Sequence, residues 1–134
     1  MNVDEKIKAF LSAGPFAVVG ASTNREKYGN KVFRCYLQNG HDAYPVHPKA
    51  TEVEGRPCFP ALGKLPETVR AISVITPPAM TERIVEEAHA AAVEFIWMQP
   101  GAESPAAIAR AEELGMIVIA GGPCLLVALG FRDE

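Results

Sequence analysis

Short apolar segments alternate with amphipathic segments along this chain. The candidate strands span residues 16–19, 42–46, 71–75, 95–98 and 116–120, and their length and composition are typical of buried strands. Between them, apolar residues recur every three or four positions, which predicts helices that bury one face. This succession of strand, helix and strand indicates a parallel sheet with helices over both faces. We therefore expect residues 1–134 to form a single α/β domain.

Capping and breaking residues set the expected helix boundaries. Residues 4–12 should form a leading helix capped by Asp4, and Asn30 should cap the helix that follows the first strand. Ser104, followed by a proline, predicts the start of another helix. Glycine and proline interrupt residues 50–69, where we expect only a short edge strand near Val53 and a turn of helix near Leu62.

The expected sheet determines where a ligand should bind. We predict a Rossmann-like, three-layer fold with a five-stranded parallel sheet in the order 3-2-1-4-5, numbering the strands along the chain. That order places the topological switch point between the first and fourth strands. Ligands of such sheets bind outside the carboxyl ends of the strands, so the candidate positions are the residues that directly follow each strand.

The loop after the first strand carries the strongest chemical signal. Small residues run from Gly20 to Thr23, and they let backbone N–H groups approach a phosphate beside the start of the next helix. The usual Gly-x-Gly-x-x-Gly motif is absent, since Ser22 and Arg25 stand where its second and third glycines would be. The second strand runs out to Lys49 rather than to the carboxylate that binds the ribose of NAD. The loop therefore favours a bulkier phosphorylated cofactor.

Composition and charge narrow the possible partners. The 134 residues carry a formal net charge of −3, which disfavours nonspecific binding to nucleic acid. The sequence shows no signal peptide and no apolar run of membrane-spanning length, so we expect a cytoplasmic protein without a membrane partner. Three cysteines, Cys35, Cys58 and Cys124, are an odd number without metal-ligand spacing. We expect them to be reduced thiols.

Several motifs together resemble the small stand-alone CoA-binding proteins, which are similar in fold to the N-terminal domain of the succinyl-CoA ligase alpha subunit. The resemblance covers nearly the whole chain and rests on residues 19–22, 44–49, 54–57, 65–66, 76–78 and 97–102. It implies a domain that binds CoA or an acyl-CoA. The ligase transfers phosphate through a histidine in a domain that this sequence does not contain, so the resemblance does not imply that activity here.

The resemblance also implies which residues bind the cofactor. The residues after the first strand would surround its phosphates, Lys49 would contact a phosphate, and Val46 with Pro48 would border the adenine. Pro77 and its neighbours would line the path of the pantetheine arm, while His47 would pack against the base. The complete predicted set is Gly20, Ala21, Ser22, Thr23, Arg25, Val46, His47, Pro48, Lys49, Thr76, Pro77, Pro78, Gln99 and Gly101.

The chemistry of CoA supports a site of this kind independently of the resemblance. CoA carries a diphosphate and a separate 3′-phosphate, so its site needs cations as well as backbone donors. Arg25 and Lys49 are the favoured cations because they lie at strand ends. Lys27 and Lys31 are also candidates, although charges at a helix start are more often solvated.

Two functions compete at this point. The first is a noncatalytic module that binds CoA or acyl-CoA. The second is a small NAD(P)-binding oxidoreductase or nucleotide-binding regulator, in which Lys49 would receive a 2′-phosphate. Known catalytic motifs are missing, so we predict no catalytic residue and no metal site. Cys124 could form a mixed disulfide with CoA, but a structural, buried cysteine is the simpler interpretation. The sequence indicates no particular protein partner.

Overall fold

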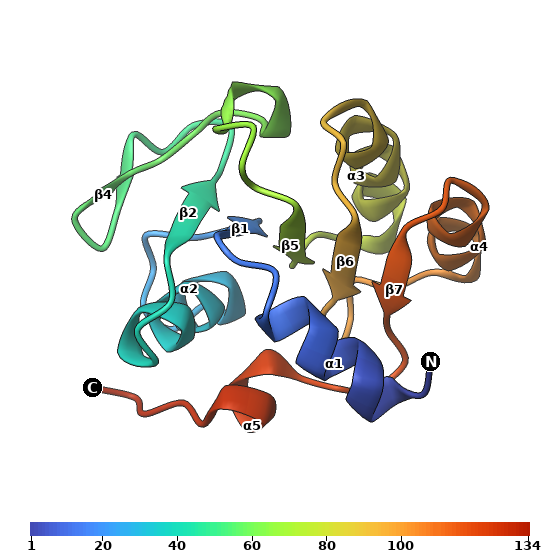
Figure 1. Ribbon diagram of the computed structural model, residues 1–134. Coiled ribbons are helices and arrows are strands. Elements are labelled where there is room, and N and C mark those ends of the chain that lie inside the picture. The colour runs from blue at the N-terminus through green and yellow to red at the C-terminus, as the bar shows by residue number, and fades with distance from the viewer.

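A five-stranded parallel sheet forms the centre of the computed structural model, which describes residues 1–134 (Figure 1). In spatial order its strands are β2 (Ala43–Val46), β1 (Phe16–Val19), β5 (Ala71–Val74), β6 (Phe95–Met98) and β7 (Ile117–Ile119). Every neighbouring pair is parallel, and Phe16 lies in register with both Ala43 and Ala71. The predicted α/β fold with a five-stranded parallel sheet is therefore confirmed.

The predicted strand order 3-2-1-4-5 is wrong for one strand. The third long strand, β5, does not lie outside β2 but pairs with β1 on one side and β6 on the other. Ala71, Ile72 and Val74 have no solvent exposure, as expected for a strand inside the sheet. β2 forms the edge instead, and an edge tolerates Pro45, which has no N–H to donate. The switch point consequently lies between β1 and β5, not between the first and fourth strands.

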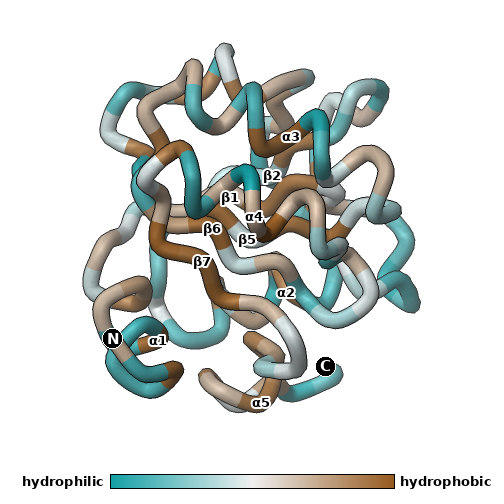
Figure 2. Tube along the Cα trace, turned by 90° about the vertical axis from the view of Figure 1, so that its right-hand side faces the viewer, coloured by the Kyte–Doolittle hydropathy of each residue, from teal (hydrophilic) through white to brown (hydrophobic).

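Helices cover both faces of the sheet. On one face lie α1 (Val3–Leu11), α2 (Tyr28–Gln38) and α5 (Leu125–Leu129), and on the other lie α3 (Pro78–Ala90) and α4 (Pro105–Glu113), as Figure 1 shows. Side chains of β1 alternate between the two apolar clusters, with Ala17 and Val19 in one and Phe16 and Val18 in the other. The trace coloured by hydropathy shows the strands as the apolar centre of these layers (Figure 2).

Two of the predicted helix caps are wrong. Asn2, not Asp4, caps α1, because its side chain accepts from the Glu5 amide while the Glu5 carboxylate accepts from the Asn2 amide. The helix α2 begins at Tyr28, two residues before Asn30. Ser104 caps α4 as predicted, since its hydroxyl oxygen accepts from the amide of Ala107.

The segment between β2 and β5 contains a strand near Val53 and a turn of helix near Leu62, as expected, but the strand does not join the edge of the main sheet. A small hairpin pairs β3 (Glu52–Val53) with β4 (Arg56–Pro57), and a turn of 3-10 helix, η1, spans Leu62–Lys64. Phe59 extends the edge of β2, because its amide donates to the Pro45 carbonyl over 2.9 Å. The short helix α5 was not predicted from the sequence. None of the helices has the length and apolar character needed to cross a membrane.

Candidate functional site

Two glycines bring the end of β1 against its neighbours. Gly20 has φ +96°, and a Cβ there would overlap the carbonyl of Ile75 at the end of β5. A Cβ on Gly29, in the first turn of α2, would overlap the carbonyl of Gly20. Both overlaps fall well inside the 3.0 Å below which real Cβ contacts are essentially absent. The absence of side chains at these positions therefore allows the first turn of α2 to pack directly on the loop after β1.

Asn30 holds the same loop from inside α2. Its side-chain amide donates to the Ser22 carbonyl over 2.8 Å and to the Glu54 carboxylate over 3.1 Å. Its side-chain oxygen accepts from Nε of Arg34 over 2.7 Å. Asn30 is fully buried, so these bonds satisfy a polar side chain that would otherwise be costly to bury. The asparagine predicted to cap the helix instead positions the loop after β1.

The amides available in this loop lie slightly later than predicted. The amides of Gly20 and Ala21 both donate to the Val46 carbonyl, over 3.1 and 3.3 Å, and so are already satisfied. Further along, amides without a hydrogen bond inside the protein belong to Ser22, Thr23, Arg25, Tyr28 and Gly29. The last two form the start of α2, where the helix dipole favours an anion. This combination of amides can donate to phosphate oxygens.

A cavity of about 630 Å³ opens beside this loop, which is a size typical of ligand sites. The ends of β1, β2 and β5 form one part of it, and α3, the segment 60–62 and Lys27 form the rest. Its lining residues are Val19, Gly20, Ala21, Ser22, Lys27, Val46, His47, Pro48, Pro60, Ala61, Leu62, Ile75, Thr76, Pro77, Met80, Arg83, Ile84 and Glu87. The cavity therefore lies at the carboxyl edge of the sheet, beside the switch point between β1 and β5.

The structure brings together part of the predicted set of site residues. The predicted residues that line the cavity are Gly20, Ala21, Ser22, Val46, His47, Pro48, Thr76 and Pro77. Those outside its lining are Thr23, Arg25, Lys49, Pro78, Gln99 and Gly101. The carboxyl ends of β1, β2 and β5 thus contribute to one cavity, whereas the end of β6 does not.

The cations of the cavity differ from those favoured by the sequence. The Nε of Arg25 lies 3.5 Å from the Glu54 carboxylate, and its guanidinium donates to the Glu134 carbonyl over 2.6 Å. Lys27 and Arg83 line the cavity instead. Arg83 was missed because only the packing of α3 against the segment 60–62 places it there. A signal was present, since Met80, Arg83 and Glu87 share one helical face at spacings of three and four residues.

His47 shapes the turn that follows β2. Its Nδ1 accepts from the amides of Lys49 and Ala50, over 3.0 and 3.1 Å. These contacts assign the neutral ring as the tautomer that carries its proton on Nε2. Because His47 also lines the cavity, it can place an aromatic surface and one donor beside a ligand while it holds the turn.

Gln99 and Cys124 belong to a separate, partly buried network. The side-chain oxygen of Gln99 accepts from the Tyr28 hydroxyl over 3.1 Å and from the Leu125 amide over 2.9 Å. The Tyr28 hydroxyl also lies 2.7 Å from the sulfur of Cys124. Burial raises the pKa of Tyr28 well above its usual range, so the hydroxyl stays protonated as a donor. Gln99 therefore ties α2 to the start of α5, and Cys124 does not line the cavity.

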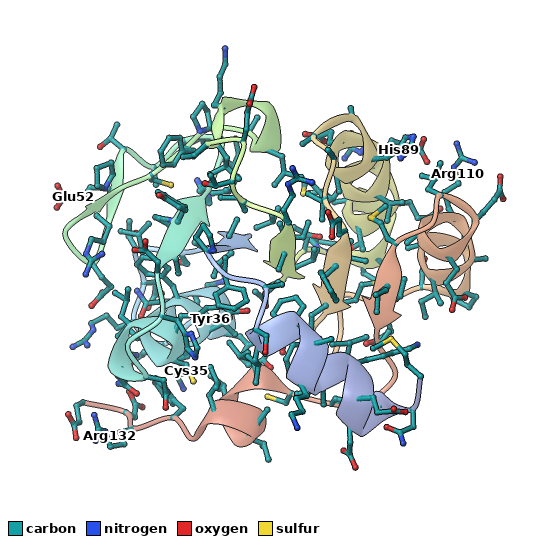
Figure 3. All side chains as sticks on the ribbon, in the orientation of Figure 1. Cys35, Tyr36, Glu52, His89, Arg110 and Arg132 are labelled. Atoms are coloured by element: carbon teal, nitrogen blue, oxygen red, sulfur yellow. The ribbon has the colours of Figure 1, made fainter.

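Several other titratable groups lie away from the cavity. Cys35 and Tyr36 point into the interior from α2, whereas His89 and Arg110 lie at the outside of α3 and α4 (Figure 3). Burial raises the pKa of the Cys35 thiol to about 11. No group of three or more His, Cys, Asp or Glu side chains could hold a metal ion. The cavity beside β1 is therefore the strongest candidate site of the molecule.

Comparisons with known proteins give relatives of two kinds. Over 71 residues, or 53% of this chain, the sequence is 35% identical to an ADP-forming acetate–CoA ligase of Archaeoglobus fulgidus. That match covers only 10% of the ligase. A dinucleotide-forming acetyl-coenzyme A synthetase of Ca. Korarchaeum cryptofilum, solved with phosphate and ADP, is similar over 78% of this chain and 25% of its own, with 28% identity and a TM-score of 0.71.

The second kind of relative is a small protein of the same size. A hypothetical protein from Pyrococcus horikoshii matches 96% of this chain and 92% of its own, with 29% identity and a TM-score of 0.87. The sequence profile of the CoA binding domain family matches residues 15–130. That range includes every strand and all the helices except α1. The resemblance inferred from the motifs is thereby confirmed, and this chain belongs to the CoA binding domain family.

Proposed function

We propose that the chain binds CoA or an acyl-CoA in the cavity beside β1 and does not itself catalyse a reaction on it. One observation carries this proposal. The cavity lies at the carboxyl ends of β1, β2 and β5, and the amide of Ser22 at its wall is free to donate to a phosphate. The position and the donors suit the phosphate-bearing half of a nucleotide cofactor.

The lining residues fit the parts of CoA. Ser22 and Lys27 would hold the diphosphate, with the start of α2 behind them. Gly20 and Gly29 are in close backbone contact and carry no side chains, so neither residue blocks a phosphate here. Val46, Leu62 and other apolar residues would border the adenine, and Thr76 with Pro77 would line the path of the pantetheine arm.

The residues around the cavity support binding rather than chemistry. No serine or cysteine there is paired with a general base, and Nδ1 of His47 is engaged by two backbone amides. The ligase and synthetase activities belong to longer proteins that this chain matches only in part. We therefore propose no ligase activity for this chain on its own.

Thermal unfolding with CoA, NAD, NADP and ATP tests the proposal directly. A ligand that binds only the folded state raises the unfolding temperature, and at a hundred times its Kd it adds about 2.7 kcal/mol of stability. We expect CoA or acetyl-CoA to give the largest increase. A larger increase with NADP would favour the oxidoreductase alternative, and an increase with none of the four would reject a nucleotide site.

A further inference from the structure

From the charges in this cavity, and resting on the proposed function, we infer that Arg83 recognises the 3′-phosphate of CoA and so distinguishes CoA from ligands without that phosphate. Lys27 and Arg83 are the cationic side chains of the lining. They come from different walls, since Lys27 directly precedes α2 and Arg83 lies in the second turn of α3. The cavity thus offers two separated positive charges.

Arg83 is free to bind an anion. Most arginines of the chain are engaged: each of Arg25, Arg34, Arg70, Arg110 and Arg132 forms an ion pair. Arg83 forms no ion pair and no side-chain hydrogen bond, and among the arginines it shares this state only with Arg56, which lies outside the cavity. An exposed guanidinium at the wall of a cavity can bind a phosphate through two parallel hydrogen bonds.

The positions of the two cations match the two anionic parts of CoA. Lys27 directly precedes α2 and lines the same cavity as Ser22, and the Ser22 amide and the start of α2 are the donors suited to the diphosphate. Arg83 lies further along α3, opposite the segment that contains Leu62, where the apolar lining suits the adenosine. The 3′-phosphate is attached to the ribose of that adenosine, so it would emerge near Arg83 and away from Lys27.

Glu87 limits where the phosphate can lie. It also lines the cavity, one turn beyond Arg83, but no ion pair joins the two side chains. A carboxylate repels a second anion, so the phosphate is favoured on the side of Arg83 that faces Met80 and the start of α3. The resemblance instead favoured Lys49 as a phosphate ligand, and Lys49 lies outside the lining. The two residues therefore make competing predictions.

Calorimetric titration with CoA and with 3′-dephospho-CoA tests this assignment. The wild-type protein should bind CoA about tenfold more tightly than dephospho-CoA, the size expected for hydrogen bonds to a charged group. Arg83→Met should remove that difference by weakening CoA alone, and Arg83→Lys should restore part of it. Arg56→Met is the matched control, because it removes an unpaired arginine that does not line the cavity, and the tenfold difference should persist.

The possible results distinguish a failure of the role assigned to Arg83 from a failure of CoA binding itself. If Arg83→Met leaves the CoA to dephospho-CoA ratio unchanged, or if Lys49→Met abolishes that ratio instead, the assignment of Arg83 is overturned while CoA binding stands. A wild-type protein that binds both ligands equally also overturns it. If the wild-type protein binds neither ligand, the proposed function itself fails. Unfolding temperatures of the variants should equal that of the wild type, since Arg83 is exposed.

Discussion

Replacing Gly29 with alanine tests how closely α2 packs on the end of β1. In an exposed helix this change would be favourable by about 1 kcal/mol, because alanine is the better helix former. Here the new Cβ would overlap the carbonyl of Gly20, which is backbone and cannot rotate away. Overpacking of this kind costs about 3 kcal/mol at the upper end of its usual range. The net expectation is a loss of about 2 kcal/mol in the free energy of unfolding.

Urea denaturation of the wild type and of Gly29→Ala measures that difference. For a domain of this size the same loss should lower the unfolding temperature by roughly 6–10 °C. Gly63→Ala is the matched control, because a Cβ at Gly63 meets nothing within 4 Å and its backbone is not in the left-handed region. The control should be at least as stable as the wild type. If Gly29→Ala is also as stable as the wild type, the close packing of α2 on β1 is refuted.

Three further predictions concern single contacts. Ser104→Ala should lower the free energy of unfolding by about 1 kcal/mol in urea, because the α4 cap is lost, and an unchanged midpoint would contradict this. Burial raises the pKa of Cys35 to about 11, so mass spectrometry after iodoacetamide treatment at pH 8 should find Cys35 modified only in unfolded protein. The hydrogen bond from Arg110 lowers the pKa of Glu86. The ionised Glu86 therefore stabilises the folded state at neutral pH, and this contribution is lost as acid protonates the carboxylate. Glu86→Gln should therefore reduce the fall in unfolding temperature between neutral and acidic pH, and an identical fall would rule out the contribution.

The elements of the fold were predictable because they depend on local patterns. The main strands are short apolar runs, and runs of this kind are buried between the two helix layers of a parallel sheet regardless of which strands lie next to them. The helix at Ser104 was predictable for the same reason, since a capping serine followed by proline acts within a few residues. Hydrophobic periodicity and helix capping were therefore sufficient to predict the sheet and most of the helices that cover its two faces.

The strand order was not predictable from those patterns. An apolar strand such as β5 has the same composition whether it pairs with β1 or lies outside β2. The neighbours depend on the path of residues 47–70, which form a hairpin and η1 rather than a regular crossover helix. One local signal pointed the right way, because Pro45 within β2 is best tolerated at an edge.

The candidate site shows the same division between local and distant information. The loop after β1 was predicted from its small residues, which act through their own backbone, and Gly20, Ala21 and Ser22 line the cavity. The cations were harder, because their availability depends on partners far along the chain. Arg25 is engaged by Glu54 and Glu134, whereas Arg83 reaches the cavity only because α3 packs against η1. No sequence pattern specifies such contacts.

A titration of ¹⁵N-labelled protein with CoA, followed by the amide signals in NMR spectra, tests the binding site most directly. The amides of Ser22 and Thr23 and the signal of Lys27 should shift as CoA is added, because they surround the proposed diphosphate position. The signals of Ala91 and Val93, at a second hollow of about 360 Å³ elsewhere on the molecule, should stay in place. Shifts confined to that second hollow, or no shifts at saturating CoA, would contradict binding at the end of β1.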